Sequence, residues 1–340
     1  MIAVAAAGAI TPVGLGLVDS IASIYTRVQL FEDLGALDTD GEPLSGMKIP
    51  FADGMTATER LAAMALSVID ECTARIDAAS QPIPLILCCP EAGTVAPDAV
   101  DLPARLLAEV TVKAPVPIDR ARSRVIARGR AGALEALGAG LALLKEASVP
   151  YCLVGGVDSL VDDDRVQALA DDRRLLTPTN KDGFIAGEAG AMLLLTHRPG
   201  PDALATWLGA AAGNEEATRG SDRPITGAGM QEAMSKALAL AKTPYETLAC
   251  LAHDFSGEER YFEELLLASS RLAKGNANNT VEIPALSVGE TGAAAGFLAI
   301  AVLAFLHGKS VHARPSLAVL SCDGPERGAV VLGPVPAARR

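Results

Sequence analysis

Short apolar runs that alternate with longer helical patterns constrain the fold of this chain most strongly. Residues 83–89, 151–157 and 191–195 are apolar at almost every position, so we expect strands that are buried on both faces. Helical patterns cover residues 57–74 and 132–147 between these runs. This alternation predicts an α/β protein with parallel strands.

A second series of elements with similar content follows residue 200. It comprises strands at 206–212 and 247–253, helices at 230–240, 258–271 and 292–306, and a hairpin of 316–321 with 329–332. With 340 residues, half of them hydrophobic, the chain can bury a large core. The pattern predicts two α/β halves, residues 1–200 and 201–340, and leaves a single doubly wound sheet open as the alternative.

The charge of the chain argues against several classes of function. A net charge of −12 disfavours nucleic-acid binding, which needs positive charge concentrated on one face. The most apolar stretch, residues 292–306, is shorter than the roughly 20 residues that span a bilayer, so we expect a buried helix there and no membrane partner. The N-terminus lacks the basic residues of a signal peptide.

The cysteines also bear on the cellular compartment and on metals. None of the six has the spacing of a metal site, and most lie in or beside apolar runs: Cys72, Cys88, Cys89, Cys152, Cys250 and Cys322. We interpret them as reduced, buried thiols of a cytoplasmic protein, and we predict neither a metal nor a cofactor.

Five glycine-containing segments, far apart in the sequence, carry a family resemblance. They are residues 8–14 (GAITPVG), 155–159 (GGVDS), 182–190 (DGFIAGEAG), 287–296 (SVGETGAAAG) and 320–328 (LSCDGPERG). In order and spacing they resemble the landmarks of β-ketoacyl synthases of the thiolase superfamily, and residues 182–190 are the most specific match. The resemblance implies the thiolase fold, with two halves related by a pseudo-two-fold axis, a five-layered αβαβα core and usually a homodimer across a sheet edge.

The residues at the expected catalytic positions differ from those of a ketosynthase. That chemistry uses a cysteine thiolate at the start of a buried helix and two histidines. Counting back from Gly155, the resemblance places the nucleophile at Arg130, and a guanidinium cannot act as one. His253 stands at the first histidine position, where an ordinary strand-end histidine is the alternative interpretation. Glu290 replaces the second histidine, and its carboxylate would repel the developing enolate.

We therefore interpret Arg130, His253 and Glu290 as vestigial positions, and we expect no condensing activity. Cys322 lies in the segment that replaces the terminal glycine-rich loop of the family. An alternative is that Cys322 acts as the nucleophile from this different position, with His253 as its base. It would lack the helix dipole that activates the usual thiol. Residual hydrolase or acyltransferase activity through Cys322 is accordingly the least favoured reading.

Arg130 also belongs to a cluster of arginines within residues 120–130. A buried arginine needs a carboxylate partner, and we predict Glu290 rather than Glu135, which an i,i+5 spacing on one helix would point away. The cluster as a whole is Arg120, Arg122, Arg124, Arg128 and Arg130. It is either a solvated or dimer-contacting stretch that pairs with aspartates 162–164, 171 and 172, or a site for an anionic partner segment or a phosphopantetheine phosphate.

Two kinds of protein partner fit a ketosynthase-like chain without its nucleophile. The chain is shorter than the usual condensing enzyme, which favours a non-enzymatic accessory chaperone for the loading of type VI secretion effectors. The alternative is a subunit like a chain length factor, which partners an active ketosynthase and its acyl carrier protein in fatty acid, polyketide or aryl polyene synthesis. Either reading predicts function through protein–protein contact, with a homodimer or a heterodimer.

Overall fold

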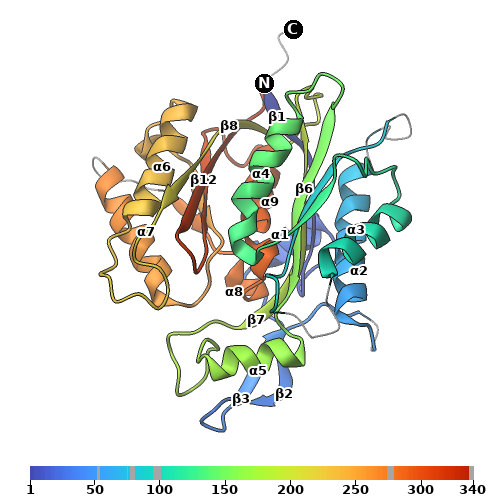
Figure 1. Ribbon diagram of the computed structural model, residues 1–340. Helices are drawn as coiled ribbons and strands as arrows, with labels where there is room; N and C mark the ends of the chain where they lie inside the picture. The colour runs from blue at the N-terminus through green and yellow to red at the C-terminus, as the bar shows by residue number, and fades with distance from the viewer. Residues whose placement is uncertain (52–53, 75, 77–80, 95–100, 274–278, 337–340) are drawn as a thin grey trace.

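The computed structural model describes residues 1–51, 54–74, 76, 81–94, 101–273 and 279–336 (Figure 1). The strands of this part are β1 (Ile2–Ile10), β2 (Glu32–Leu37), β3 (Pro43–Met47), β4 (Leu85–Cys89), β5 (Arg124–Ala127), β6 (Tyr151–Ser159), β7 (Ala186–Thr196), β8 (Ala205–Asn214), β9 (Cys250–His253), β10 (Thr280–Glu282), β11 (Ser316–Ser321) and β12 (Glu326–Gly333). The α-helices are α1 (Leu17–Tyr25), α2 (Ala57–Thr73), α3 (Leu102–Lys113), α4 (Gly132–Leu143), α5 (Asp163–Asp171), α6 (Ala228–Ala241), α7 (Glu259–Leu272), α8 (Ala285–Val288) and α9 (Ala295–Gly308).

The strand order repeats itself in the two halves of the molecule. Hydrogen bonds connect the strands in the order β10-β9-β11-β12-β8-β1-β7-β6-β4-β5. We number the five strands on each side of the β8–β1 junction in chain order. Read from the outer edge to the junction, each half then has the order 3-2-4-5-1. The β2–β3 hairpin lies off this path and pairs with β7. The repeat is the internal symmetry that the resemblance implied, and the proposed division at residue 200 falls in the connection from β7 to β8.

The elements stack as five layers, which confirms the predicted αβαβα core. Figure 1 shows α6 and α7 on one outer side, α2 and α3 on the other, and α4 and α9 between the two sheet portions. Three apolar clusters fill the spaces between these layers, and the largest surrounds α9. Among the described residues, no helix is both long enough and apolar enough to cross a membrane.

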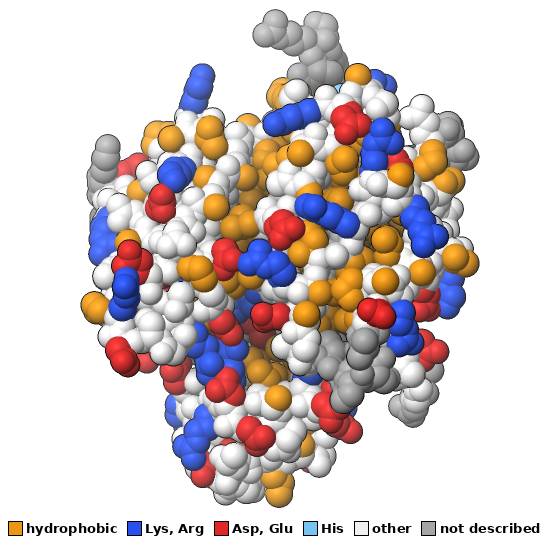
Figure 2. All heavy atoms as spheres, viewed as in Figure 1, with side chains coloured by type: hydrophobic (Ala, Val, Ile, Leu, Met, Phe, Trp, Pro, Cys, Tyr) orange, Lys and Arg blue, Asp and Glu red, His pale blue; other side chains and the backbone are white. Residues whose placement is uncertain are grey.

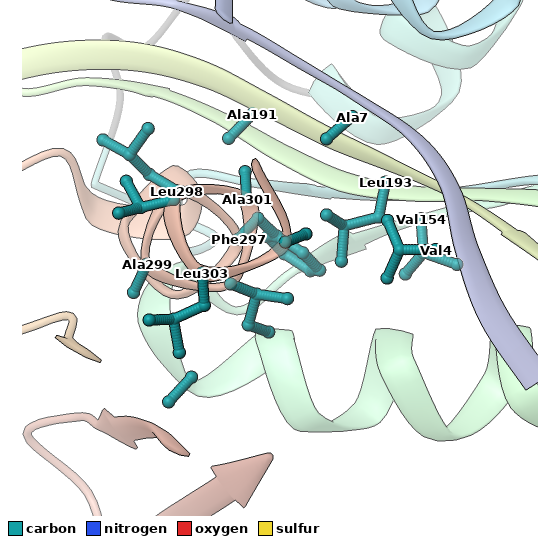
Figure 3. Packing of buried hydrophobic residues seen from close by; sticks show 14 of the residues in the cluster. Val4, Ala7, Val154, Ala191, Leu193, Phe297, Leu298, Ala299, Ala301 and Leu303 are labelled. Carbon is teal, nitrogen blue, oxygen red and sulfur yellow. The ribbon is translucent and has the colours of Figure 1, made fainter. Parts of the chain in front are cut away.

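Side-chain periodicity explains the central layer. Along β7, Leu193 and Leu195 face the central helices, whereas Met192 and Leu194 face α2 and α3, as the two-residue period of a strand requires. Because α9 lies between the two sheet portions, it is apolar around most of its circumference. Phe297 and its neighbours on α9 pack among side chains of β1, β6 and β7 (Figure 3).

Predictions about strand direction and about element ends were partly wrong. We expected the strands of the first series to be parallel, but β6 and β7 are antiparallel, whereas β4–β5, β4–β6, β9–β10 and β9–β11 are parallel. After β6 the chain forms α5 at one end of the sheet and returns beside the strand it left. Burial on both faces does not reveal strand direction. The helix predicted to reach residue 147 ends at Leu143, and the strand predicted from residue 247 begins at Cys250.

Two glycines bring three of the resemblance segments together. A Cβ atom at Gly156 would lie 2.1 Å from the carbonyl oxygen of Ala293, and one at Gly187 would lie 2.1 Å from that of Val288. Only glycine permits such close backbone contact. The Gly187 amide also donates to the carbonyl of Glu290 at 2.9 Å. Segments 155–159, 182–190 and 287–296 therefore meet beside the N-terminal ends of α4 and α9.

Candidate functional site

Arg130 lies at the start of a central helix, in the place where the resemblance puts a nucleophile. It belongs to a short 3₁₀ turn, Gly129–Ala131, that leads into α4, and Gly129 has a φ of +51°, which favours glycine. The Arg130 side chain is only 10% exposed. The local backbone thus directs a cation into the interior between the two halves.

Glu290 is the predicted partner of Arg130, and the structure confirms the pair. The Arg130 Nη1 atom donates to the Glu290 carboxylate at 3.1 Å. Its Nη2 atom donates to the Asp254 carboxylate at 3.3 Å and to the Ser321 hydroxyl at 2.7 Å. Sequence reasoning missed Asp254 and Ser321, although Asp254 directly follows His253.

Hydrogen bonds hold both carboxylates in place around Arg130. Glu290 accepts from the Ser256 hydroxyl at 2.8 Å and from the Gly292 amide at 2.9 Å. Asp254 accepts from the Ser321 amide at 3.0 and 3.1 Å. These contacts join β9, β11 and the segment before α9, so the cluster connects distant parts of the sequence.

The charges of the cluster do not balance one to one. Burial alone would lower the pKa of Arg130, but the carboxylates of Glu290 and Asp254 raise it well above its usual range. Burial raises the pKa of each carboxyl group more than the Arg130 charge and the hydrogen bonds lower it. Two desolvated carboxylates share one guanidinium, so at least one of them is held at an energetic cost.

A second group of charges borders Arg130. The guanidinium lies 5.2 Å from the ring centroid of Tyr261, whose hydroxyl donates to Asp323. Arg174 contacts both Asp323 and Glu258. Burial by itself would raise the pKa of Asp323, but Arg174 and the Tyr261 hydrogen bond outweigh it and lower the value to about 2. These partners, too, carried no signal in the sequence.

Arg327 fixes the loop that replaces the terminal glycine-rich segment. It is fully buried and contacts the equally buried Glu264 through Nε at 2.6 Å and Nη2 at 2.9 Å. Its Nη1 atom donates to the carbonyls of Cys322, Gly324 and Glu326 at 3.0, 2.8 and 2.9 Å. One side chain therefore sets the course of residues 322–326 over the site.

Cys322 and His253 do not have the geometry of a nucleophile and its base. The Cys322 thiol lies 3.4 Å from both the carbonyl and the carboxylate of Glu326, and burial raises its pKa to about 12. His253 is buried and stacked on Phe255 with ring centroids 3.8 Å apart. Burial lowers the pKa of His253 to about 3. No hydrogen bond joins Cys322 to His253 among the described residues.

The space left beside Arg130 is very small. A cavity of about 10 Å³ lies there, and the residues that line it are Arg130, Ala131, Leu134, Leu320, Ser321, Cys322 and Glu326. A single water molecule needs roughly 10–15 Å³ of such space. The cavity can accommodate a water molecule but not an acyl chain.

The other arginines of the cluster are exposed, and their partners differ from those expected. Arg122 pairs with Asp119 and Glu146, Arg124 with Glu135, and Arg128 with Glu135 and Glu326. The aspartates suggested as partners make other contacts: Asp162 caps α5, and Asp172 pairs with Arg219. Because these three arginines of the cluster each have an acidic partner, they do not form a concentrated positive patch. Acidic and basic side chains are likewise interspersed over the face drawn in Figure 2.

No protein family and no curated protein sequence matches this chain. Solved structures do match. A chain from the complex of a type II polyketide synthase acyl-carrier protein with its ketosynthase bound to the hexaketide is similar with a TM-score of 0.78 at 15% identity, over 98% of this chain and 99% of that one. A chain of the ketosynthase–chain length factor complex from Xenorhabdus doucetiae matches with a TM-score of 0.77 at 14% identity, over 98% of both chains.

This chain has the ketosynthase fold. The ishigamide ketosynthase/chain length factor is similar as well, with a TM-score of 0.76 at 15% identity over 98% of this chain and 99% of that one. These identities show shared architecture rather than shared chemistry. Within this fold, a buried ion cluster and the loop held by Arg327 surround the start of α4. Among the described residues, no group of three potential metal-ligating side chains occurs.

Proposed function

We propose that this ketosynthase-like chain is a non-catalytic subunit that binds an active ketosynthase, in the manner of a chain length factor. The observation that carries the proposal is the Arg130 cluster. A guanidinium at the start of α4, hydrogen-bonded to Glu290 and Asp254, stands where the resemblance puts the nucleophile. It leaves a cavity of about 10 Å³.

The remaining thiol near this position is poorly suited to acyl transfer. The nucleophile in thioester chemistry is the thiolate, and a Cys322 thiol with a pKa of about 12 is protonated at neutral pH. Three backbone carbonyls bound to Arg327 hold its loop in place. Arg130, His253 and Glu290 are accordingly proposed as vestigial positions with structural roles.

An available sheet edge supports the proposal of a partner subunit. In the described part of the chain, β5 pairs only with β4 and ends the sheet on that side. An uncovered edge strand can pair with a strand of another chain. The similar structures include complexes of a ketosynthase with a chain length factor and with an acyl-carrier protein. Pairing across β5 would suit a homodimer as well as a heterodimer.

The reading as a chaperone for type VI effector loading remains a prediction. It requires the same loss of the nucleophile but has no structural observation of its own. The composition of the native complex distinguishes the two readings, because one expects a ketosynthase with its acyl carrier protein and the other expects secretion and effector proteins.

Affinity purification of the tagged full-length chain from its own cells tests the proposed partner. We expect an active ketosynthase to co-purify, and we expect Val125→Asp on β5 to abolish its recovery. Val281→Asp on β10, the strand at the opposite sheet edge, is the control for position and should leave recovery unchanged. Recovery of effectors in place of a ketosynthase would move the conclusion to the chaperone reading.

Mass spectrometry tests the proposed lack of catalysis separately. The purified chain is incubated with acyl- and malonyl-carrier-protein thioesters, and its intact mass is measured. No covalent acylation and no condensed product are expected, because the Cys322 thiol is protonated and Arg327 holds the Cys322 backbone in place. An acyl adduct on Cys322, abolished by Cys322→Ala, would refute the non-catalytic assignment.

A further inference from the structure

An exposed apolar surface lies along α1 and continues into the segment after it. Its members are between 46% and 62% exposed, and we call them the α1 strip: Leu15, Val18, Tyr25, Leu30, Phe31 and Leu286. Val18 and Tyr25 lie seven positions apart, so they occupy the same outer face of α1, while Leu17, Ile21 and Ile24 face the core. Large apolar side chains gathered in this way on a soluble fold are typical of interaction sites.

Polar contacts at both ends hold the α1 strip in one conformation. The Glu71 carboxylate accepts from the Leu17 amide at 2.8 and 3.0 Å, which fixes the start of α1. The Gln29 side-chain amide donates to the Leu286 carbonyl at 2.6 Å and connects the segment after α1 to α8. A surface that is ordered before binding avoids the entropic cost of ordering during binding.

The charges around the strip indicate what can cover it. Asp19, Glu32 and Asp33 are exposed beside it, and the half-buried Glu282 lies near Arg27. The rim is therefore acidic, with four carboxyl groups against one guanidinium. A second copy bound by the same surface would bring acidic rim against acidic rim, and an anionic membrane would be repelled in the same way.

We propose that the α1 strip is a docking surface for an amphipathic helix with basic flanks, supplied by a different protein. The apolar face of the helix would cover Val18, Tyr25 and Phe31, and its lysines or arginines would approach Asp19, Glu32 and Asp33. This mode combines apolar anchors with charge complementarity at the rim. The inference is independent of the proposed ketosynthase partner, because the strip and the β5 edge are formed by different elements.

Site-specific photocrosslinking tests this inference in the cell that makes the protein. A benzophenone amino acid replaces Leu30 in the full-length chain, and a second variant carries it at Leu240, which is exposed on α6 and serves as the control. We expect position 30, and not position 240, to crosslink to a predicted amphipathic helix with net positive charge in another protein. Crosslinks to a second copy of the chain, to lipid, or to an acidic segment would each overturn the proposal, as would a yield no greater than that of the control.

Two sets of substitutions then test the chemistry of recognition. Tyr25→Ser with Phe31→Ser removes two aromatic anchors and should lower the crosslink yield about tenfold, since aromatic side chains dominate such interfaces. Glu32→Lys with Asp33→Lys should lower the yield and reduce its sensitivity to salt. All four positions are exposed, so each variant should keep the circular dichroism spectrum of the wild type. An unchanged yield in both double variants would contradict docking at the strip.

Discussion

Two buried arginines of this chain differ in how their charge is compensated. Arg327 faces one carboxylate, Glu264, and its remaining donors reach three backbone carbonyls. Arg130 faces two carboxylates, Glu290 and Asp254, and its Nε atom has no hydrogen-bond partner among the described residues. The first arrangement is fully satisfied, whereas the second carries excess negative charge and an unused donor.

This difference separates an arginine that organises a loop from one that occupies the position where the resemblance places a nucleophile. Buried ion pairs are costly to desolvate, and they persist where every remaining donor and acceptor finds a partner. Arg327 meets that condition and sets the path of the loop around Cys322. Arg130 meets it only in part, which is expected of a cation placed where the fold resembles a catalytic pocket. The two arginines should therefore respond differently to mutation.

The largest effect is expected for Arg327→Ala. This change leaves the fully buried Glu264 carboxylate with Arg260 alone, at 3.7 Å, and removes the Arg327 donor from three backbone carbonyls. Loss of one partner of a buried pair should lower the free energy of unfolding by about 4 kcal/mol. Urea denaturation followed by circular dichroism measures it. Lys236→Ala, which breaks the exposed pair with Glu232, is the control and should cost at most about 0.5 kcal/mol. Equal losses in the two variants would contradict the structural role.

A smaller loss is expected for Arg130→Ala, about 3 kcal/mol in the same denaturation experiment. The change leaves Glu290 and Asp254 together without a cation, but their raised pKa values allow them to take up protons and limit the cost. The adjacent cavity can also admit water. Arg124→Ala, at an exposed position beside Glu135, is the matched control and should change little. A loss greater than that of Arg327→Ala would reverse the comparison.

The sequence predicted the fold and one ion pair, but not the network. The glycine segments mark positions of close backbone contact, and their order identified the fold. The spacing of Arg130 and Glu290 from these segments then placed the two residues beside each other. Asp254 and Ser321 escaped detection because an aspartate after a strand and a serine at a strand end are common and carry no pattern. Arg327 and Glu264 lie in ordinary-looking segments, and only the folded chain brings them together. The antiparallel course of β7 was missed because burial on both faces is the same in either direction.

The smallest effect is expected for Glu290→Gln, about 2 kcal/mol at neutral pH. The amide keeps the shape of the carboxylate, and its single oxygen can still accept from the Ser256 hydroxyl and from Arg130, but its NH2 group cannot accept from the Gly292 amide. The substitution also removes one of two negative charges, so Arg130 is left with the single carboxylate of Asp254, as Arg327 is with that of Glu264. Glu264→Gln has no second carboxylate within reach of Arg327 among the described residues and should cost clearly more.

The pH dependence of the Glu290→Gln effect gives the sharpest test of excess negative charge. Because the folded protein raises the pKa of Glu290 above the value of 4.5 that applies when unfolded, the folded state holds the proton more tightly. Stability from this group is thus fully present below about pH 4.5 and is lost as the pH rises towards the folded pKa. Glu290→Gln removes that loss. The difference in the free energy of unfolding between wild type and variant should therefore be smaller at pH 7 than at pH 4.5. Denaturation curves of both proteins across this range measure the difference. If the variant instead becomes less stable relative to the wild type as the pH rises, Glu290 is stabilised as a carboxylate and Arg130 needs both of its partners.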